Sequence, residues 1–83
     1  MKISFNTENR VCASFIDVET DDDSGVIKKV VFHGGCPGSH LGIAALAEGM
    51  KVEDAIKRLS GIRCGGRQTS CPDQLAEALK RML

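Results

Sequence analysis

The sequence predicts an α+β fold, in which a small antiparallel sheet (an N-terminal strand plus a hairpin) is followed by three helices packed on one face. Two patterns indicate this class. Extended segments rich in β-branched residues run as far as His33, and segments of helical periodicity follow it. Because strands precede helices along the chain, the helices are expected to share one face of the sheet. With 83 residues and no linker-like segment, residues 1–83 are expected to form one domain.

Three segments are expected to be strands. Residues 2–6 form a short first strand, and Cys12–Glu19 is an extended run in which β-branched and aromatic residues are frequent. Val26–His33 is a second extended run. The Asp, Ser and Gly residues of Asp21–Gly25 favour a turn, so the last two runs are expected to form a β-hairpin.

The register of this hairpin bears on function. A hairpin folded about Asp22–Asp23 places Cys12 opposite His33 or Gly34, and Cys36 follows directly. Two cysteines that are distant in sequence are therefore expected to meet at one end of the sheet.

Three helices are expected after the hairpin. The first has Ser39 as its N-cap and continues to about Met50, where Gly49 favours a stop. Val52–Leu59 has one apolar stripe at helical spacing. The last runs from Pro72 to about Met82, with Pro72 at the first helical position and Cys71 at the N-cap.

Composition and charge exclude several classes of function. Eleven basic residues balance eleven acidic ones, so no excess charge favours nucleic-acid or polybasic membrane contact. The N-terminus lacks the apolar core of a signal peptide, and no apolar stretch is long enough to cross a membrane. We therefore expect a cytoplasmic protein, in which thiols stay reduced.

The four cysteines are the strongest functional signal. Cys36 and Cys64 have glycine neighbours, and Cys36 and Cys71 lie at predicted helix starts, where the helix dipole favours thiolates. Four thiolates complete the tetrahedral shell of a closed zinc site. We therefore expect Cys12, Cys36, Cys64 and Cys71 to bind one metal ion, most simply Zn²⁺. Because free cysteines are often buried, a purely structural role stays open.

Other polar residues near the cysteines have two interpretations. His33 and His40 could serve as substitute ligands or proton donors, or as a strand-end residue and a first-turn helix residue. Arg63 and Arg67 flank Cys64 and could favour its thiolate or face a phosphate, although a solvated loop charge is the simpler explanation.

The segment Thr69-Ser70-Cys71-Pro72-Asp73 spells the motif that names the TSCPD domain family, which the chain resembles over nearly its whole length. It is similar to the small stand-alone four-cysteine branch. The same domain ends the vitamin B12-dependent ribonucleotide reductases, so the resemblance implies a link to ribonucleotide reduction and DNA precursor synthesis. It points toward ribonucleoside-diphosphate reductase, but this chain is too short to be that enzyme alone.

A weaker similarity is to NifU-type iron–sulfur scaffold proteins. Cys12, Cys36 and Cys71 fall on their three cysteine positions, and the resemblance implies the same fold. Those scaffolds have an Asp two residues after the first cysteine, where this chain has Ser14, and this chain adds Cys64. A fourth thiolate favours a closed site over a transient cluster.

The leading functional expectation is therefore a zinc-binding module that presents a surface to a ribonucleotide reductase or another redox protein. One alternative is an iron–sulfur cluster or sulfur carrier that uses the same cysteines. A second is a thiol–disulfide reductant, which needs a close cysteine pair with an accessible thiol. A homo-oligomer is a further option, because an uncovered sheet edge could pair between subunits.

Overall fold

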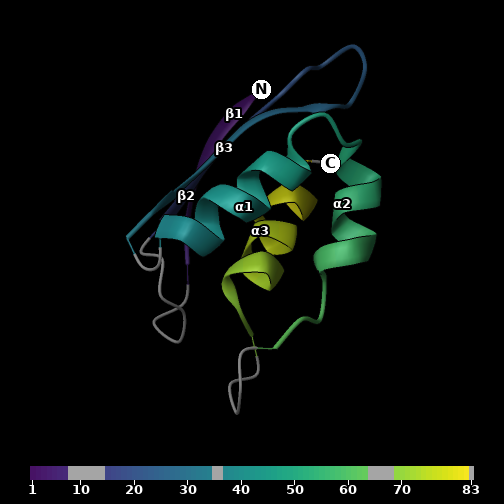
Figure 1. Ribbon diagram of the computed structural model, residues 1–83. Helices are drawn as coiled ribbons and strands as arrows, with labels where there is room; N and C mark the ends of the chain where they lie inside the picture. Colours follow the sequence, from purple (N-terminus) through teal and green to yellow (C-terminus); the bar gives the residue numbers. More distant parts are fainter. Residues whose placement is uncertain (8–14, 35–36, 64–68, 83) are drawn as a thin grey trace.

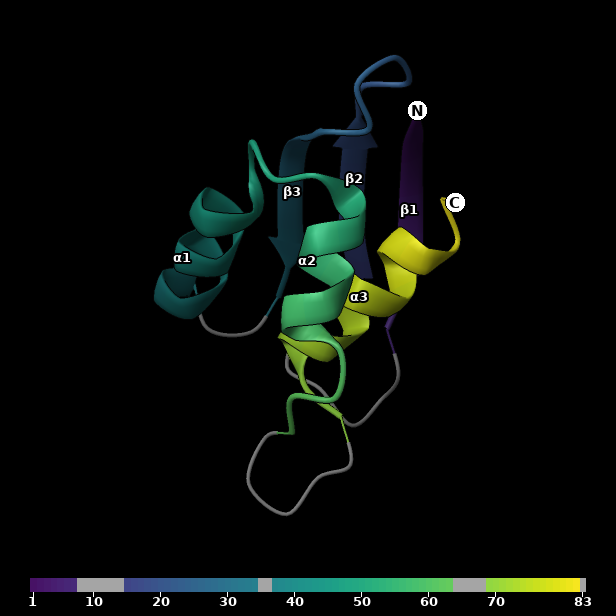
Figure 2. The same cartoon turned by 90° about the vertical axis from the view of Figure 1, so that its right-hand side faces the viewer.

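The computed structural model describes residues 1–7, 15–34, 37–63 and 69–82 (Figure 1). The three helices lie together on one face of a sheet, and the other face is open (Figure 2). This arrangement confirms the predicted α+β class. The elements are β1 (Lys2–Asn6), β2 (Phe15–Thr20), β3 (Ile27–His33), α1 (Pro37–Ala47), α2 (Val52–Leu59) and α3 (Cys71–Lys80).

The strands of the described residues form an antiparallel sheet of order β1-β2-β3. The predicted register of the hairpin is wrong, because His33 pairs with Phe15 rather than with Cys12. Two features shift the pairing. Thr20 pairs with Ile27, so the turn is centred one residue later than Asp22–Asp23, and a bulge between Glu19 and Thr20 adds a further residue.

The free edge of β3 is partly covered by the segment that follows α1. The main chain of Ile27 accepts from the Gly49 N–H at 2.8 Å and donates to the Met50 carbonyl at 2.8 Å. The Glu48 carboxylate accepts from the Val30 N–H at 3.2 Å. These bonds anchor the C-terminal end of α1 to the sheet.

The three helices occur in the predicted order, but α1 ends at Ala47 rather than near Met50, and two predicted caps are wrong. α1 begins at Pro37, so Ser39 lies inside the helix rather than at its N-cap. Proline suits a first helical position because its missing N–H would be unpaired there anyway. α3 begins at Cys71 with Ser70 as the N-cap. None of the helices in the described part of the chain is long and apolar enough to cross a membrane.

The core lies between the sheet and the helices. Ile16 and Val18 point from β2 toward the helices, and Leu75 and Leu79 of α3 pack against them. Ile16, Leu75 and Leu79 have no exposed surface. Phe5 is the aromatic residue of this buried cluster. Aliphatic residues dominate this core.

Candidate functional site

The motif Thr69–Asp73 forms the start of α3. The Ser70 hydroxyl accepts from the Asp73 N–H at 3.2 Å, which caps the helix, and Cys71 and Pro72 occupy the first turn. The Ser70 hydroxyl also donates to the Ile62 carbonyl at 2.7 Å. This bond joins Ile62 and Ser70, which lie on either side of Cys64 in the sequence.

The Asp73 carboxylate makes the second connection across this loop. Its Oδ1 accepts from the Gly61 N–H at 2.7 Å, and its Oδ2 accepts from the Thr69 hydroxyl at 2.5 Å. The Thr69 hydroxyl in turn accepts from the Gln74 amide at 3.0 Å. We call Thr69, Ser70, Asp73 and their partners Gly61 and Ile62 the α3 clasp. Its hydrogen bonds fix both ends of the loop that contains Cys64.

The roles of the clasp residues were missed at the sequence level. The signal that could have revealed them is Ser70 followed three residues later by Asp73, the spacing of a helix-capping pair. Thr69 and Ser70 are both buried, at 4% and 5% exposure. Buried hydroxyls need partners, so the burial itself reflects the hydrogen bonds of the clasp.

Of the four predicted metal ligands, Cys71 lies within the described residues. Its thiol is free and buried, with 9% of the residue exposed. Cys12, Cys36 and Cys64 lie outside the described residues. Within residues 1–7, 15–34, 37–63 and 69–82, no three histidine, cysteine or acidic side chains are grouped so that they could hold a metal ion.

The segments that flank the four cysteines lie toward the same end of the molecule. β1 and β3 end there, and β2, α1 and α3 begin there, at the lower end of Figure 2. The pairing of Phe15 with His33 fixes the strand ends. The hydrogen bonds of the α3 clasp join Gly61 and Ile62, which precede Cys64, to the start of α3, which contains Cys71.

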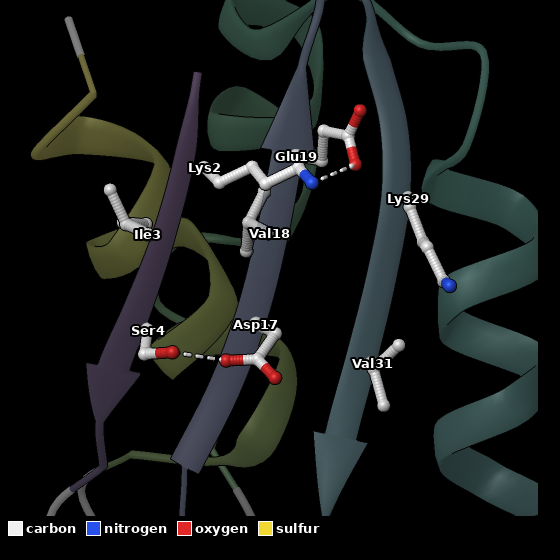
Figure 3. Close-up of a pocket in the computed structure, with 8 residues that line it drawn as sticks. All are labelled: Lys2, Ile3, Ser4, Asp17, Val18, Glu19, Lys29 and Val31. Atoms are coloured by element: carbon white, nitrogen blue, oxygen red, sulfur yellow. Dashed lines mark hydrogen bonds and ion pairs between the residues drawn. The ribbon is translucent and has the colours of Figure 1, made fainter.

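His33 belongs to a polar cluster on the open face of the sheet. Its Nε2 lies 2.8 Å from Asp17 Oδ2, and its ring stacks on Phe15 with 4.1 Å between centroids. The Ser4 hydroxyl donates to the same carboxylate (Figure 3). The Ser4 hydrogen bond, and then that of His33, lower the pKa of Asp17.

This cluster contains the residue types of a hydrolytic triad but not its arrangement. Nucleophilic catalysis requires a serine hydroxyl hydrogen-bonded to the imidazole. Here Ser4 and His33 both contact Asp17, so the imidazole does not face the hydroxyl. The cluster therefore acts as a cross-strand polar contact between β1, β2 and β3.

His40 is a buried residue in the first part of α1. It is 6% exposed, and its ring stacks on Phe32 with 4.5 Å between centroids. Its Nδ1 has no hydrogen-bond partner among the residues that the structure describes. The interpretation of His40 as a first-turn helix residue is confirmed, and its packing role is the stack on Phe32. Arg63 is exposed, and Arg67 lies outside the described residues.

Comparisons with known proteins identify one family. The model of the TSCPD domain matches residues 2–83, which is nearly the entire chain. No curated protein and no solved structure matches significantly. The match covers the helices and strands of the described residues and includes the clasp motif that opens α3. The chain therefore belongs to the TSCPD domain family.

Proposed function

We propose that the protein is a metal-binding module in which Cys12, Cys36, Cys64 and Cys71 hold one Zn²⁺ ion as thiolates. The observation that carries this proposal is that all four cysteine-flanking segments lie toward the same end of the fold. Four sulfurs satisfy the tetrahedral preference of zinc without an open position.

Chain length limits how far two of these cysteines can be from the sheet end. Cys12 lies three residues before Phe15, and Cys36 lies three residues after His33. Since Phe15 and His33 are paired, each cysteine Cα lies within about 11 Å of one partner of the same pair. The hairpin register therefore favours a shared site for Cys12 and Cys36.

The α3 clasp has the same effect on the other two cysteines. Cys64 is two residues from Ile62, whose carbonyl accepts from Ser70, the neighbour of Cys71. The Cα of Cys64 therefore lies within about 7 Å of the Ile62 Cα. Both oxygens of Asp73 are engaged in hydrogen bonds, so this carboxylate serves as a support rather than as a ligand.

The surroundings of Cys71 favour a ligand over a redox nucleophile. A thiol–disulfide reductant needs an accessible thiol, whereas Cys71 is 9% exposed. Its place in the first turn of α3 sets it at the positive end of the helix dipole, which favours a metal-bound thiolate. When bound, the ion would supply a structural cross-link between the sheet and α3.

Elemental analysis tests this proposal. Protein purified without chelator should contain about one equivalent of zinc. Serine replacement of each of the four cysteines should reduce the content to well below half, because a lost thiolate opens the shell. Less than about half an equivalent of any transition metal in the wild type, with four free thiols, would overturn the proposal. A stoichiometric content of iron and sulfide, together with visible absorption, would instead identify an iron–sulfur cluster as the bound cofactor.

We also propose a ribonucleotide reductase or another redox protein as the partner of this module. The support is family membership together with the resemblance described above. Isothermal titration calorimetry tests this partnership. The purified protein is titrated into a vitamin B12-dependent reductase that lacks its own C-terminal TSCPD domain. Saturable heat is expected, and its absence with the metal-loaded protein would contradict the partnership.

A further inference from the structure

His40 carries a buried polar atom that the described ranges of the chain leave without a partner. The residue is 6% exposed, and no atom of those ranges forms a hydrogen bond with its Nδ1. The nitrogen itself is inaccessible, so bulk water does not supply the missing bond. Since nearly all buried polar groups of native proteins are hydrogen-bonded, we expect the partner of this nitrogen outside the described ranges or in a bound group.

Packing alone does not explain an imidazole at this position. The ring of His40 stacks on Phe32 of β3 with 4.5 Å between centroids. A groove beside the ring is otherwise lined by Val30, Val31, Phe32, Gly34, Leu41 and Ala44, none of which has a polar side chain. A phenylalanine would make the same stack in these apolar surroundings without burying an unpaired nitrogen. The imidazole is therefore expected to form a hydrogen bond in addition to the stack.

The place of His40 in the fold brings it near one of the proposed metal ligands. α1 begins at Pro37, directly after Cys36, so the Cα atoms of Cys36 and His40 lie within about 9 Å of each other. Gly34, two residues before Cys36, lines the same groove as His40. Side chains lean toward the N-terminus of their helix, so that of His40 is directed toward the start of α1. Chain connectivity therefore holds Cys36 close to His40 from both sides.

We infer that the Nδ1–H of His40 donates a hydrogen bond to the thiolate sulfur of Cys36 in the metal-loaded protein. The inference rests on the proposed function. Zn²⁺ held by four thiolates is net negative, and a buried negative charge requires N–H donors directed at it. His40 is then a positioning residue rather than a ligand: its stack on Phe32 holds the ring, and the ring holds the sulfur.

Competition with a chelator measures the zinc affinity that this hydrogen bond supports. His40→Phe keeps an aromatic ring on Phe32 but removes the donor, and it should weaken zinc binding by about 10- to 100-fold, the usual effect of losing a group that supports a ligand. His40→Asn retains an N–H at the place of Nδ1 and should bind zinc more tightly than His40→Phe. His33→Phe makes the same exchange at the histidine that contacts Asp17, and it should leave the zinc affinity unchanged.

The stability of the metal-free variants separates this role from packing. Without zinc, His40→Phe should melt no lower than the wild type, because the unpaired nitrogen is gone while the stack remains. His40→Asn should melt lower, because the stack is lost. The two variants are thus expected to rank in opposite orders for zinc affinity and for stability. If His40 only packs, the zinc affinity should follow the stability instead.

A long-range ¹H–¹⁵N NMR spectrum of the zinc-loaded wild type identifies the donor directly. The ring proton of His40 is expected on Nδ1. A proton on Nε2, with Nδ1 either free or bound to the metal, would overturn the inference, as would wild-type zinc affinity in folded His40→Phe. Both results would leave metal binding by the module intact. A wild type that binds no metal would overturn the inference and the proposed function together.

Discussion

Asp73 shows how one side chain can organise a site without binding a ligand. Its two carboxylate oxygens connect Gly61 and Thr69, which lie on either side of the loop containing Cys64. Its own N–H is bound by the Ser70 hydroxyl. Asp73, the last residue of the TSCPD motif, therefore couples the conformation of both loop ends to the start of α3.

Replacement of Asp73 by alanine is expected to destabilise the fold by about 1–3 kcal/mol, because the Gly61 N–H and the Thr69 hydroxyl lose their acceptor. Urea unfolding followed by circular dichroism measures this. Asp73→Asn keeps one acceptor oxygen and should show a smaller loss. Asp23→Ala, in the exposed turn, serves as the control and should stay within about 0.5 kcal/mol of the wild type. Equal stability of Asp73→Ala and Asp23→Ala would refute the role of the clasp.

Asp17 gives a pH-dependent prediction. Its pKa is lowered from 3.8, first by the Ser4 hydroxyl and then by His33. A lowered pKa means that the folded state favours the carboxylate, so the stabilisation is present above the ordinary pKa and is lost as pH falls through the lowered one. Ser4→Ala should therefore raise the pKa of Asp17 toward its ordinary value in a ¹³C NMR titration.

Asp21 provides the reference within the same titration. The pKa of Asp21 is also lowered, by the N–H groups of Asp23 and Ser24. These groups lie in the turn, at the opposite end of β2 from Phe15. Ser4→Ala should leave the pKa of Asp21 unchanged. An Asp17 pKa that does not move in Ser4→Ala would show that the Ser4 bond does not favour the carboxylate.

At the scale of elements, hydrophobic periodicity predicted the structure more reliably than the turn and capping residues did. The apolar stripe of Val52–Leu59 fixed α2 at the bounds that the structure has. The predicted hairpin register is wrong because the position of the turn and the bulge each shift the strand pairing. Neither can be recognised from hydrophobic periodicity. The cap of α3 was placed one residue late, since both Ser70 and Cys71 precede the proline and only the hydroxyl makes the capping bond.

Gly49, which follows α1, gives the prediction for this scale. Its φ of 92° lies in the left-handed region, and its N–H donates to the Ile27 carbonyl. Gly49→Ala should cost about 1–2 kcal/mol in urea unfolding, although a Cβ there meets nothing within 4 Å, because the backbone itself is strained. Gly49→Asn should cost less, since asparagine tolerates this conformation better. An alanine variant as stable as the wild type would rule out this conformation in solution.

For the whole molecule, the sequence predicted the fold class, since strand and helix patterns follow from hydrophobic periodicity. The relative positions of the four cysteines could not be predicted from the sequence, because they depend on the strand register and on the loops. Cys71 alone lies in the described residues, so the shared site stays a prediction. The clasp and the Phe15–His33 pair are the tertiary features that favour it.

Metal removal should reveal how much of the stability depends on the cysteines. Leu75 and Leu79 are fully buried, but a chain of 83 residues buries a limited core, so a bound ion has a large relative effect. Zinc at 100–1,000 times its dissociation constant adds about 3–4 kcal/mol. A strong chelator should therefore lower the melting temperature by roughly 10–25 °C. Cys71→Ser should melt near the chelated wild type and respond little to chelator, whereas Leu75→Ala should be destabilised but keep its response. If chelation leaves the melting temperature of the wild type unchanged, the sulfurs do not hold an ion that the fold needs.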